Sequence, residues 1–332
     1  MFSGMQPSGE AHIGNYLGAL RQWVELQERY ECFFCIVDEH AITGEFTPAE
    51  LPERVFDLAV SFLAVGLDPE RSTIFVQSDV AEHVRLAWIF NSVTPVGDLE
   101  RMTQYKDKSS RRESVPAGLL NYPILQAADI LLYRAGHVPV GEDQIQHLEL
   151  AREIARRWNG RFGDLFPEPE AILSPAGRIL GLDGAAKMSK SMGNTVGILD
   201  EPEAIQARVR TAVTDPQRIR RDDPGRPEVC NVFTLHQHFT PAEQIPDIAA
   251  QCRGGTRGCV ECKQILAEHI GDHFAEARAR ASELKAHPDR VLAVLDAGAE
   301  RARREARKTM DAVREQMGMV WRKRLQPTGD LR

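Results

Sequence analysis

The chain has 332 residues, of which 42% are apolar and 27% charged, and its net charge is −7. This length predicts two domains, or one large domain with an appendage, and the composition is ordinary for a soluble globular protein. No apolar run is long enough to cross a bilayer, and the N-terminus lacks the basic and then apolar pattern of a secretion signal. We therefore expect a cytoplasmic protein with no membrane partner. The acidic total does not exclude nucleic acid, whose binding needs only a local basic face.

The first twenty residues predict a short strand, a turn rich in glycine, proline and serine, and a helix whose apolar stripe begins at Leu17. Gly9 and Gly14 stand where the backbone would approach a ligand or a neighbouring strand closely. A helix N-terminus presents free N–H groups and the positive end of the dipole, so this turn suits phosphate. His12 and Asn15 add neutral donors on the first turn. The alternative is a strand–turn–helix whose glycines serve only the turn.

A continuous apolar run over residues 32–38 predicts a buried parallel strand, followed by polar residues up to His40. Open α/β sheets place their sites at the carboxyl ends of such strands. Cys32 and Cys35 have the spacing of a redox pair. An odd offset on a strand puts them on opposite faces, however, so we expect two buried thiols that act as small apolar side chains.

Helical and strand patterns alternate in the next segments. Residues 47–65 predict a helix with Thr47 as N-cap and a proline at its first position, residues 72–78 a strand, and residues 82–91 a helix. This alternation favours a parallel sheet with helices on both faces.

Residues 99–118 change in character and read as an insertion. Its polar part runs from Leu99 to Arg112 and is followed by Pro116 and Gly118. It is either a solvated charged loop or a cationic arm that reaches toward phosphate. Its basic residues are Lys106, Lys108, Arg111 and Arg112.

Residues 119–133 predict a long apolar helix with a few polar groups. Tyr122, Gln126 and Asp129 are spaced by four and three residues, so they share one face. A carboxylate among so many apolar residues is at least partly buried and needs a hydrogen-bond donor. That donor is either a neighbouring backbone group or an N–H group of a ligand.

Residues 137–144 predict another short strand that ends in glycine and acidic residues, and residues 145–158 an amphipathic helix. Residues 177–197 are loop-like and rich in glycine. They contain Lys187 and Lys190 among small residues, which makes a mobile cationic loop. The pattern alone is also that of a solvated surface turn.

Strand signals end near residue 198. We therefore predict a Rossmann-like α/β domain over 1–197, with a parallel sheet between two layers of helices, and an all-helical C-terminal domain over 198–320. The tail 321–332 has no strong pattern, and we expect it to be disordered. Helical patterns cover residues 201–215, 241–252, 259–285 and 290–318.

Four cysteines late in the chain have the spacing C-x21-C-x6-C-x2-C: Cys230, Cys252, Cys259 and Cys262. In a cytoplasmic chain such a group predicts a metal site. Common zinc sites have two C-x-x-C pairs and this chain has one here, while four thiolates also suit a [4Fe–4S] cluster. Spacing alone leaves zinc and iron open, and four unrelated thiols are the third possibility.

Two motifs carry a resemblance. His12–Asn15 resembles the HIGH element of class I aminoacyl-tRNA synthetases, and Lys187–Ser191 is similar to their KMSKS loop. Gln6–Gly9, Ala127–Leu131 and Val140–Gln144 look like bacterial tryptophanyl-tRNA synthetases, and the similarity extends to about residue 320. The related tyrosyl enzymes usually have a different lysine loop and a glycine-rich stretch in place of residues 141–143.

One position departs from the pattern. Many tryptophan enzymes carry Met where this chain has Gln126, and the tyrosine enzymes use Gln there, although a subset of tryptophan enzymes shares it. Tyrosine activation therefore stays an alternative. A synthetase-like paralogue that binds RNA without charging it is another, although both motifs are intact.

The resemblance implies a two-step reaction: L-tryptophan and ATP give tryptophanyl-adenylate and pyrophosphate, and the aminoacyl group then passes to tRNA(Trp). It implies Mg²⁺ as cofactor and His12, Lys108, Lys187 and Lys190 as catalytic residues, with the two loop lysines stabilising the leaving pyrophosphate. Asp129 would accept the indole N–H, and Tyr122, Gln126, Gln144 and His40 would bind the ammonium or its neighbourhood. The implied ATP site comprises Gln6, Pro7, Ser8, Gly14, Asn15, Gly141, Glu142, Asp143, Leu180, Lys187, Met188, Ser189, Lys190 and Ser191.

For the four cysteines the resemblance favours a structural [4Fe–4S] cluster beside the anticodon-recognition region, with zinc as the alternative. It also implies a homodimer. The cations near the cysteines would give the local basic face for tRNA, or else a solvated helix surface. They are Arg218, Arg220, Arg221, Arg253, Arg257 and Lys263.

Overall fold

Parallel strands form the centre of the N-terminal half. The computed structural model describes residues 1–44, 46–110, 113–177 and 179–320. Strands β1 (Phe2–Met5), β2 (Cys32–Ile36) and β3 (Ser72–Val76) pair in parallel in the order β1-β2-β3. All three coincide with predicted strands, and their carboxyl ends meet at one edge of the sheet.

Strands β4 (His137–Val140) and β5 (Glu170–Leu173) form a second parallel pair that lies beside β1. Ser3 donates a hydrogen bond from Oγ to the carbonyl of Pro139 over 3.3 Å. Pro139 has no N–H group to donate, and among the described residues β1 and β4 belong to two separate sheets. Strand β5 has no signal in the sequence, because it is four residues long and largely exposed.

The two faces of the sheet carry two separate apolar cores. Cys32 and Phe34 point into one core, and Phe33 and Cys35 into the other. The prediction of opposite faces is therefore confirmed. Burial raises the pKa of Cys32 to about 11 and that of Cys35 well above its ordinary value, so both thiols stay protonated at neutral pH.

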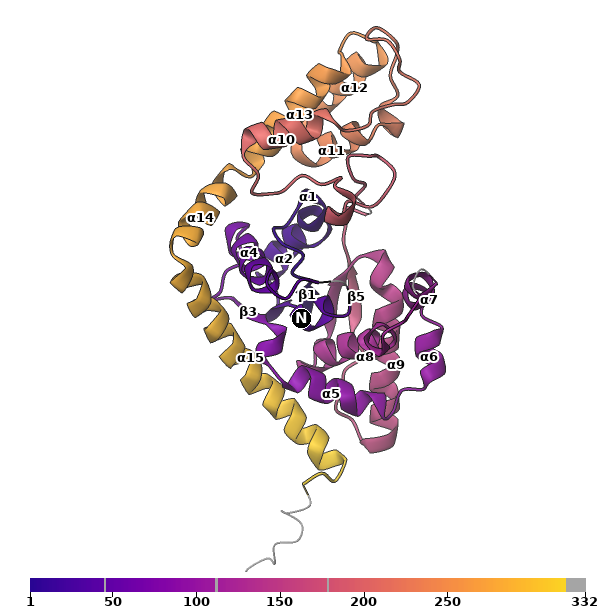
Figure 1. Ribbon diagram of the computed structural model, residues 1–332, viewed down its shortest axis with the longest axis vertical. Helices are drawn as coiled ribbons and strands as arrows, with labels where there is room; N and C mark the ends of the chain where they lie inside the picture. Colours follow the sequence, from indigo (N-terminus) through magenta and orange to yellow (C-terminus); the bar gives the residue numbers. More distant parts are fainter. Residues whose placement is uncertain (45, 111–112, 178, 321–332) are drawn as a thin grey trace, which may run out of the picture.

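Helices cover both faces, as predicted (Figure 1). Helices α2 and α4 contribute to the first core, and α5, α8 and α9 to the second. The bounds are α1 (Ile13–Asn15), the π-helix η1 (Tyr16–Leu20), α2 (Arg21–Leu26), α3 (Asp38–Ala41), α4 (Leu51–Ala64), η2 (Gln77–Asp79), α5 (Glu82–Asn91), α6 (Val96–Glu100), α7 (Thr103–Ser109), α8 (Ala117–Leu132), η3 (Glu142–Gln144) and α9 (Ile145–Phe162).

Two expectations in this half need correction. The helix expected from residue 47 begins at Leu51, because the carbonyl of Thr47 accepts the N–H groups of Glu50 and Leu51 in a turn before the helix. The segment 99–118 is not simply a loop, since it contains helix α7, which packs beside α8. Arg111 and Arg112 lie outside the described residues.

The C-terminal helices divide into two groups (Figure 1). Helices α10–α13 lie together at one end of the molecule, whereas α14 and α15 return along the first half. The helix predicted over 259–285 is two helices, which separate at Phe274, and α11 has no counterpart in the prediction. The bounds are η4 (Lys190–Met192), α10 (Pro202–Arg210), η5 (Pro227–Val229), α11 (Asn231–Phe239), η6 (Ala242–Gln244), α12 (Ile245–Arg253), α13 (Cys259–His273), α14 (Ala275–Ala286) and α15 (Pro288–Gln316).

Helix α15 packs directly on β3. Gly298 allows this approach, because a Cβ at that position would collide with the carbonyl of Ile74. Ala302 and Ala306 continue the contact into the second core. The predicted tail 321–332 lies outside the described residues. Among the residues that the structure describes, no helix is both long and apolar enough to cross a membrane.

Candidate active site

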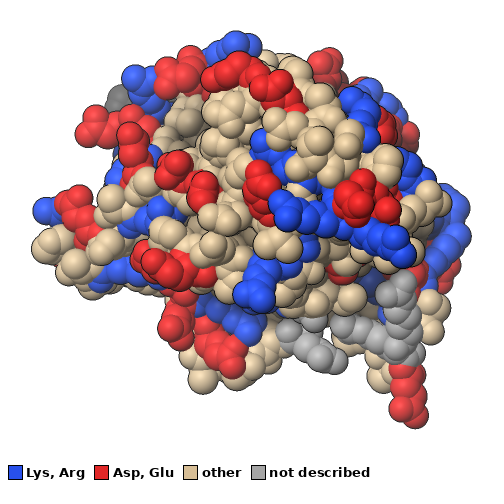
Figure 2. Space-filling model, turned by 90° about the horizontal axis from the view of Figure 1, so that it is seen from above, with Lys and Arg blue, Asp and Glu red and all other residues tan. Residues whose placement is uncertain are grey.

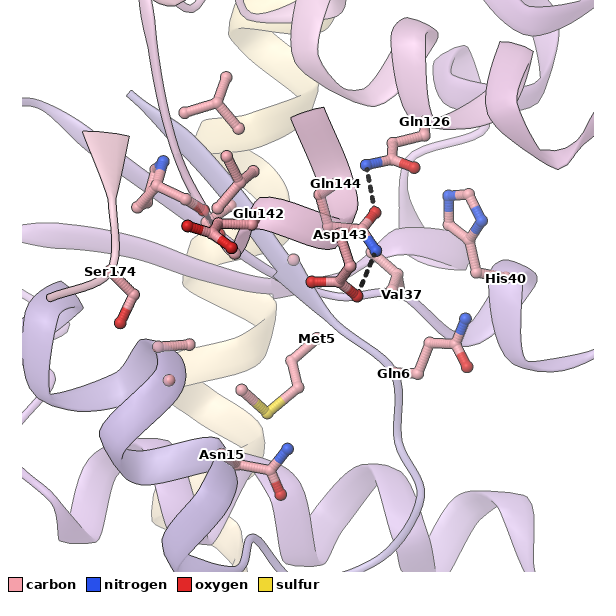
Figure 3. A pocket seen from close by; sticks show the side chains of 18 of the residues that line it. Met5, Gln6, Asn15, Val37, His40, Gln126, Glu142, Asp143, Gln144 and Ser174 are labelled. Carbon is pink, nitrogen blue, oxygen red and sulfur yellow. Dashed lines mark hydrogen bonds between the residues drawn. The ribbon is translucent and has the colours of Figure 1, made fainter. Parts of the chain in front are cut away.

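A cavity of about 810 Å³ opens at the carboxyl ends of β1 and β4. Asn15 from α1 lies at one end, and His40 and Gln126 lie at the other (Figure 3). Asp143 and Gln144 lie between them, just beyond β4. The cavity thus joins the predicted nucleotide end to the predicted amino-acid end.

His12 fixes the start of α1. Its Nδ1 accepts the backbone N–H of Asn15 over 3.3 Å, and the Asn15 Oδ1 accepts the His12 backbone N–H over 3.1 Å. This reciprocal cap satisfies two donors at the helix start. Burial, and then the nearby charges of Lys190 and Lys187, lower the pKa of His12 to about 4, so the ring is neutral at pH 7.

Backbone hydrogen bonds join the first motif to the segment that follows the lysine loop. The N–H of Ile13 donates to the carbonyl of Val196 over 2.9 Å, and the N–H of Ile198 donates to the carbonyl of Ala11 over 3.0 Å. A Cβ on Gly14 would lie 3.1 Å from Cβ of Met188. The first helix and the lysine loop therefore touch here, and a side chain at this position would require Met188 or the ring of His12, 3.0 Å from that Cβ, to shift.

The lysine loop has a fixed base. The N–H of Gly181 donates to the carbonyl of Ala186 over 2.9 Å, and Asn194 accepts the N–H of Ser189 over 2.8 Å and donates to Asp183 over 2.6 Å. Asn194 is buried against Gly181, where a Cβ would collide with its side chain. Asp183 and Asn194 were not predicted as site residues, since their partners are distant enough in the chain to leave no periodic signal.

The predicted catalytic cations all lie around this cavity. Lys187 Nζ is 3.4 Å from Asp143 Oδ2, and this charge and the hydrogen bonds lower the pKa of Asp143 although burial opposes the shift. Lys190 Nζ lies over Gly9, where a Cβ would be only 2.8 Å away and the backbone has φ +96°. Lys108 lies over the ring of Tyr122, 5.1 Å from its centroid.

Asp129 is 1% exposed and is held by three side chains. Its Oδ1 accepts Gln77 Nε2 over 2.8 Å and lies 2.6 Å from His83 Nδ1, while His40 Nε2 is 2.8 Å from Oδ2. Burial alone would raise its pKa, but the bonds from His40 and His83 lower it to about 2. The donors are thus side chains, and the neighbouring backbone expected as one alternative does not supply them.

His83 extends this network away from the cavity. Its Nε2 lies 2.8 Å from the hydroxyl of Tyr133, whose pKa burial raises well above its ordinary value. The neutral phenol can donate to Nε2, which fixes the tautomer with the proton on Nδ1, toward Asp129. His83 and Gln77 were not predicted as partners of Asp129, because single polar residues in apolar segments give no recognisable motif.

The remaining amino-acid-site candidates lie together, as the helix spacing predicts. Gln126 donates to Gln144 over 3.3 Å, and Gln144 donates to Asp143 over 3.2 Å (Figure 3). The hydroxyl of Tyr122 lies 2.8 Å from Nε2 of His147, and burial raises the pKa of Tyr122 to about 12. Tyr122 is therefore a neutral hydrogen-bonding group at the cavity wall.

Most predicted site residues line the cavity, and some lie just outside it. Ser189 and Lys190 follow Met188 in the lysine loop, Leu180 pairs with Lys187 of that loop, and Pro7 and Ser8 belong to the glycine turn. The side chain of Ser191 lies outside the described residues. The predicted residues that line the cavity are Gln6, His12, Gly14, Asn15, His40, Lys108, Tyr122, Gln126, Asp129, Gly141, Glu142, Asp143, Gln144, Lys187 and Met188.

The four late cysteines share one neighbourhood but do not form a ligand set as they stand. Burial and then the charges of the other three raise the pKa of Cys262 to about 12. Its sulfur lies 3.3 Å from His236 Nε2, and Cys252 Sγ lies 3.7 Å from an Arg218 nitrogen. Among the described residues, no three His, Cys, Asp or Glu side chains are arranged as the ligands of a metal ion. The predicted metal site is therefore not assembled here.

Comparison with known proteins identifies relatives over almost the whole chain. The family of class I tRNA synthetases for W and Y matches residues 1–275. A tryptophan–tRNA ligase of Deinococcus radiodurans is 52% identical over 325 residues, 96% of this chain and 98% of that protein. One of Caldanaerobacter subterraneus is 45% identical over 328 residues, covering 97% and 99%. A crystal structure of Campylobacter jejuni tryptophanyl-tRNA synthetase complexed with ADP and tryptophan has a TM-score of 0.86 at 38% identity, covering 96% and 99%.

The chain belongs to the class I tRNA synthetases of the tryptophan and tyrosine group. Because its relatives match over almost their whole length, it is an aminoacyl-tRNA synthetase with tryptophan–tRNA ligase activity. A tyrosyl-tRNA synthetase of Archaeoglobus fulgidus, 24% identical with a TM-score of 0.66, shares the fold alone.

Proposed function

We propose that the cavity binds ATP at its Asn15 end and L-tryptophan at its Gln126 end, and that the adenylate forms between them. The observation that carries this assignment is the contact of the first helix with the lysine loop at Gly14 and Met188, on the same cavity that Asp129 lines. The tryptophan carboxylate attacks the α-phosphate of ATP, and pyrophosphate leaves. The aminoacyl group then passes to the terminal ribose of tRNA(Trp).

The protein aligns the reactants and neutralises charge, because phosphoryl chemistry of this kind needs little covalent help. The glycine turn and the start of α1 hold the nucleotide, with neutral His12 beside its phosphates. Residues 141–143 hold the ribose. Lys187, Lys190 and Lys108 stabilise the leaving pyrophosphate, and Mg²⁺, which enters with ATP, neutralises part of the phosphate charge.

Replacement of Lys190 by alanine tests the role of the lysine loop. A preorganised donor to developing charge is worth roughly 3 kcal/mol, so we expect activation to slow by about a hundredfold, with much less effect on tryptophan affinity. Equal losses in the activation rate and in tryptophan binding contradict the assigned role.

Asp129 is proposed to accept the indole N–H, the one polar group of that side chain. Its three present bonds leave acceptor capacity, because an ionised carboxylate has about four lone-pair sites. A site with such an acceptor rejects analogues strongly, often without an editing step. Asp129→Asn is expected to reduce the discrimination against other amino acids, and a variant with normal selectivity removes the assignment.

The decisive experiment is ATP–pyrophosphate exchange with tryptophan and with tyrosine separately. We expect exchange with tryptophan only. Exchange with tyrosine alone supports tyrosine activation, for which Gln126 is the argument, and exchange with neither amino acid supports a paralogue that binds RNA without charging it.

The helical region over 198–320 is proposed to bind the anticodon part of tRNA. Figure 2 shows the end of the molecule that carries α10–α13, where basic and acidic side chains are intermixed with a blue band toward one side. Several of the predicted cations also serve the fold. Arg218 donates to the carbonyls of Arg221 and Arg257 over 2.6 and 2.7 Å, and Arg253 pairs with Glu228.

A [4Fe–4S] cluster on the four late cysteines is proposed as a structural group, with zinc as the alternative. Their spacing and their shared neighbourhood support it, but the thiols would have to turn toward one centre, so the present arrangement fits the group only in its donor chemistry. Iron and acid-labile sulfide analysis of anaerobically purified protein tests this. Stoichiometric zinc without iron, or neither metal, contradicts the iron assignment.

A cytoplasmic homodimer is proposed from the family alone. The oligomeric state is measured by light scattering over a range of protein concentrations, and a mass of one chain at every concentration contradicts it.

A further inference from the structure

Lys285, near the end of α14, reaches the glycine turn that precedes α1. Its Nζ lies 2.6 Å from Oε1 of Glu10 and 3.4 Å from Oδ1 of Asp57 on α4. Glu10 directly follows Gly9, over which Nζ of Lys190 lies. Lys285, which is distant from the glycine turn in the sequence, therefore pairs with Glu10 and Asp57 close to Lys190 of the lysine loop.

The same two carboxylates act on Lys190. Desolvation by burial lowers the pKa of Lys190, and the charges of Glu10 and Asp57 act in the opposite direction. The net shift is downward. Within the described part of the chain, Lys190 itself forms no ion pair, whereas Lys187 pairs with Asp143. Two ammonium groups thus lie near one pair of carboxylates, and Lys285 is the one that contacts them.

We infer that Lys285 is a positioning residue for Lys190. By occupying Glu10 and Asp57, it prevents these carboxylates from capturing Lys190, whose ammonium stays available to the phosphates of ATP. Without Lys285, the two carboxylates would attract Lys190 and draw it away from the pyrophosphate. This inference rests on the role proposed for Lys190.

The effect is modest and salt-dependent because the groups are partly exposed. Exposed ion pairs contribute up to about 1 kcal/mol, which corresponds to roughly a fivefold change in rate. Added salt screens such charges over a distance of about 8 Å at physiological ionic strength.

The experiment measures ATP–pyrophosphate exchange by Lys285→Met at low and high salt. We expect kcat to fall about fivefold at low salt, the KM for tryptophan to stay unchanged, and the loss to shrink at high salt. Adding Glu10→Gln and Asp57→Asn to Lys285→Met is expected to restore kcat, since the competing carboxylates are then gone. If Lys285 served only packing, the triple variant would have a lower kcat than Lys285→Met, because it removes more contacts.

Arg290→Met is the matched control. Arg290, on α15, pairs over 2.7 Å with Glu283 near the end of α14, and this pair includes neither Glu10 nor Asp57. We expect it to leave kcat unchanged. The Glu10→Gln and Asp57→Asn double variant, which does not depend on the folding of Lys285→Met, is expected to exchange at or above the wild-type rate.

Three results overturn the inference: a wild-type rate for Lys285→Met at low salt, no recovery in the triple variant, or a rate well below wild type in the double variant. Lys190→Ala, measured in parallel, distinguishes a failure of this inference from a failure of the proposed function. If Lys190→Ala slows activation and Lys285→Met does not, only the inference fails. If Lys190→Ala leaves the activation rate unchanged, the proposed role of the lysine loop fails as well.

Discussion

The imidazole of His83 and the carboxylate of Asp129 are joined by a 2.6 Å hydrogen bond at the wall of the candidate active-site cavity. His83 is completely buried, and Tyr133 holds its other nitrogen over 2.8 Å. His83 is therefore placed to orient the acceptor proposed for the indole N–H.

His83→Leu is expected to lower kcat/KM for tryptophan by about 5- to 150-fold, because losing one hydrogen bond to a buried charge costs about 1–3 kcal/mol. His83→Asn should lose less, since its Nδ2 can still donate to Asp129. Exchange kinetics with tryptophan and tyrosine, beside thermal unfolding, measure both effects. A stable His83→Leu protein with unchanged selectivity would argue that His83 serves only the fold.

Buried histidines are expected to make stability fall in mild acid. Burial is the main cause that lowers the pKa values of His12, His147 and His236 to about 4. The unfolded chain takes up their protons near pH 6.5 and the folded chain only near pH 4, so stability is lost as the pH falls between these values. At pH 5 the loss is on the order of 2 kcal/mol for each histidine.

Urea unfolding at pH 7.5 and pH 5 measures this loss. His236 contacts Thr240 and both the carbonyl and the sulfur of Cys262, and it does not line the cavity, so His236→Gln is a suitable probe. It is expected to reduce the difference between the two pH values. The same pH dependence with and without His236 would assign the effect to other groups.

Gly181→Ala is expected to impair activation more than tryptophan binding. A Cβ there would collide with Asn194, which holds the base of the lysine loop through Asp183 and Ser189. The displaced loop would carry Lys187 and Lys190 away from the phosphates, which lowers kcat for exchange. Gly136→Ala is the control, because a Cβ at that position has no heavy atom within 4 Å. Equal kinetics in the two variants would show that the loop tolerates the change.

Gly298→Ala is expected to destabilise the fold by about 1–3 kcal/mol, since overpacking forces α15 away from β3. Gly160→Ala on α9 is the control. It meets no heavy atom within 4 Å and should be neutral or stabilising by up to about 1 kcal/mol, because alanine favours helix. Chemical unfolding of both variants measures the difference. A similar stability for the two proteins would mean that α15 adjusts at little cost.

Local patterns were enough for much of this protein. Strands β1 to β3 and helix α5 fall where periodicity and turn residues predict them, because hydrophobic spacing is a property of neighbouring residues. The opposite faces of Cys32 and Cys35 follow from the same rule. The two motifs typical of the synthetase family could also be recognised, since each is a short contiguous string of residues.

Other features depend on residues far apart in the chain. The donors to Asp129 come from other elements, 46 to 89 residues away, and nothing in their own segments indicates this role. Strand β5 is too short and exposed to carry a pattern, and the site of α15 on β3 depends on the absence of one Cβ at Gly298.

The sequence by itself thus determined which family the motifs indicate, the alternation of strands and helices, and the residue types of the candidate site. The tertiary structure decided which partners those residues have: His83 for Asp129, Asn194 for the lysine loop, and Lys285 for Glu10. The physical reason is that hydrogen bonds and ion pairs act over a few ångströms in space, whereas periodicity reports only neighbours along the chain.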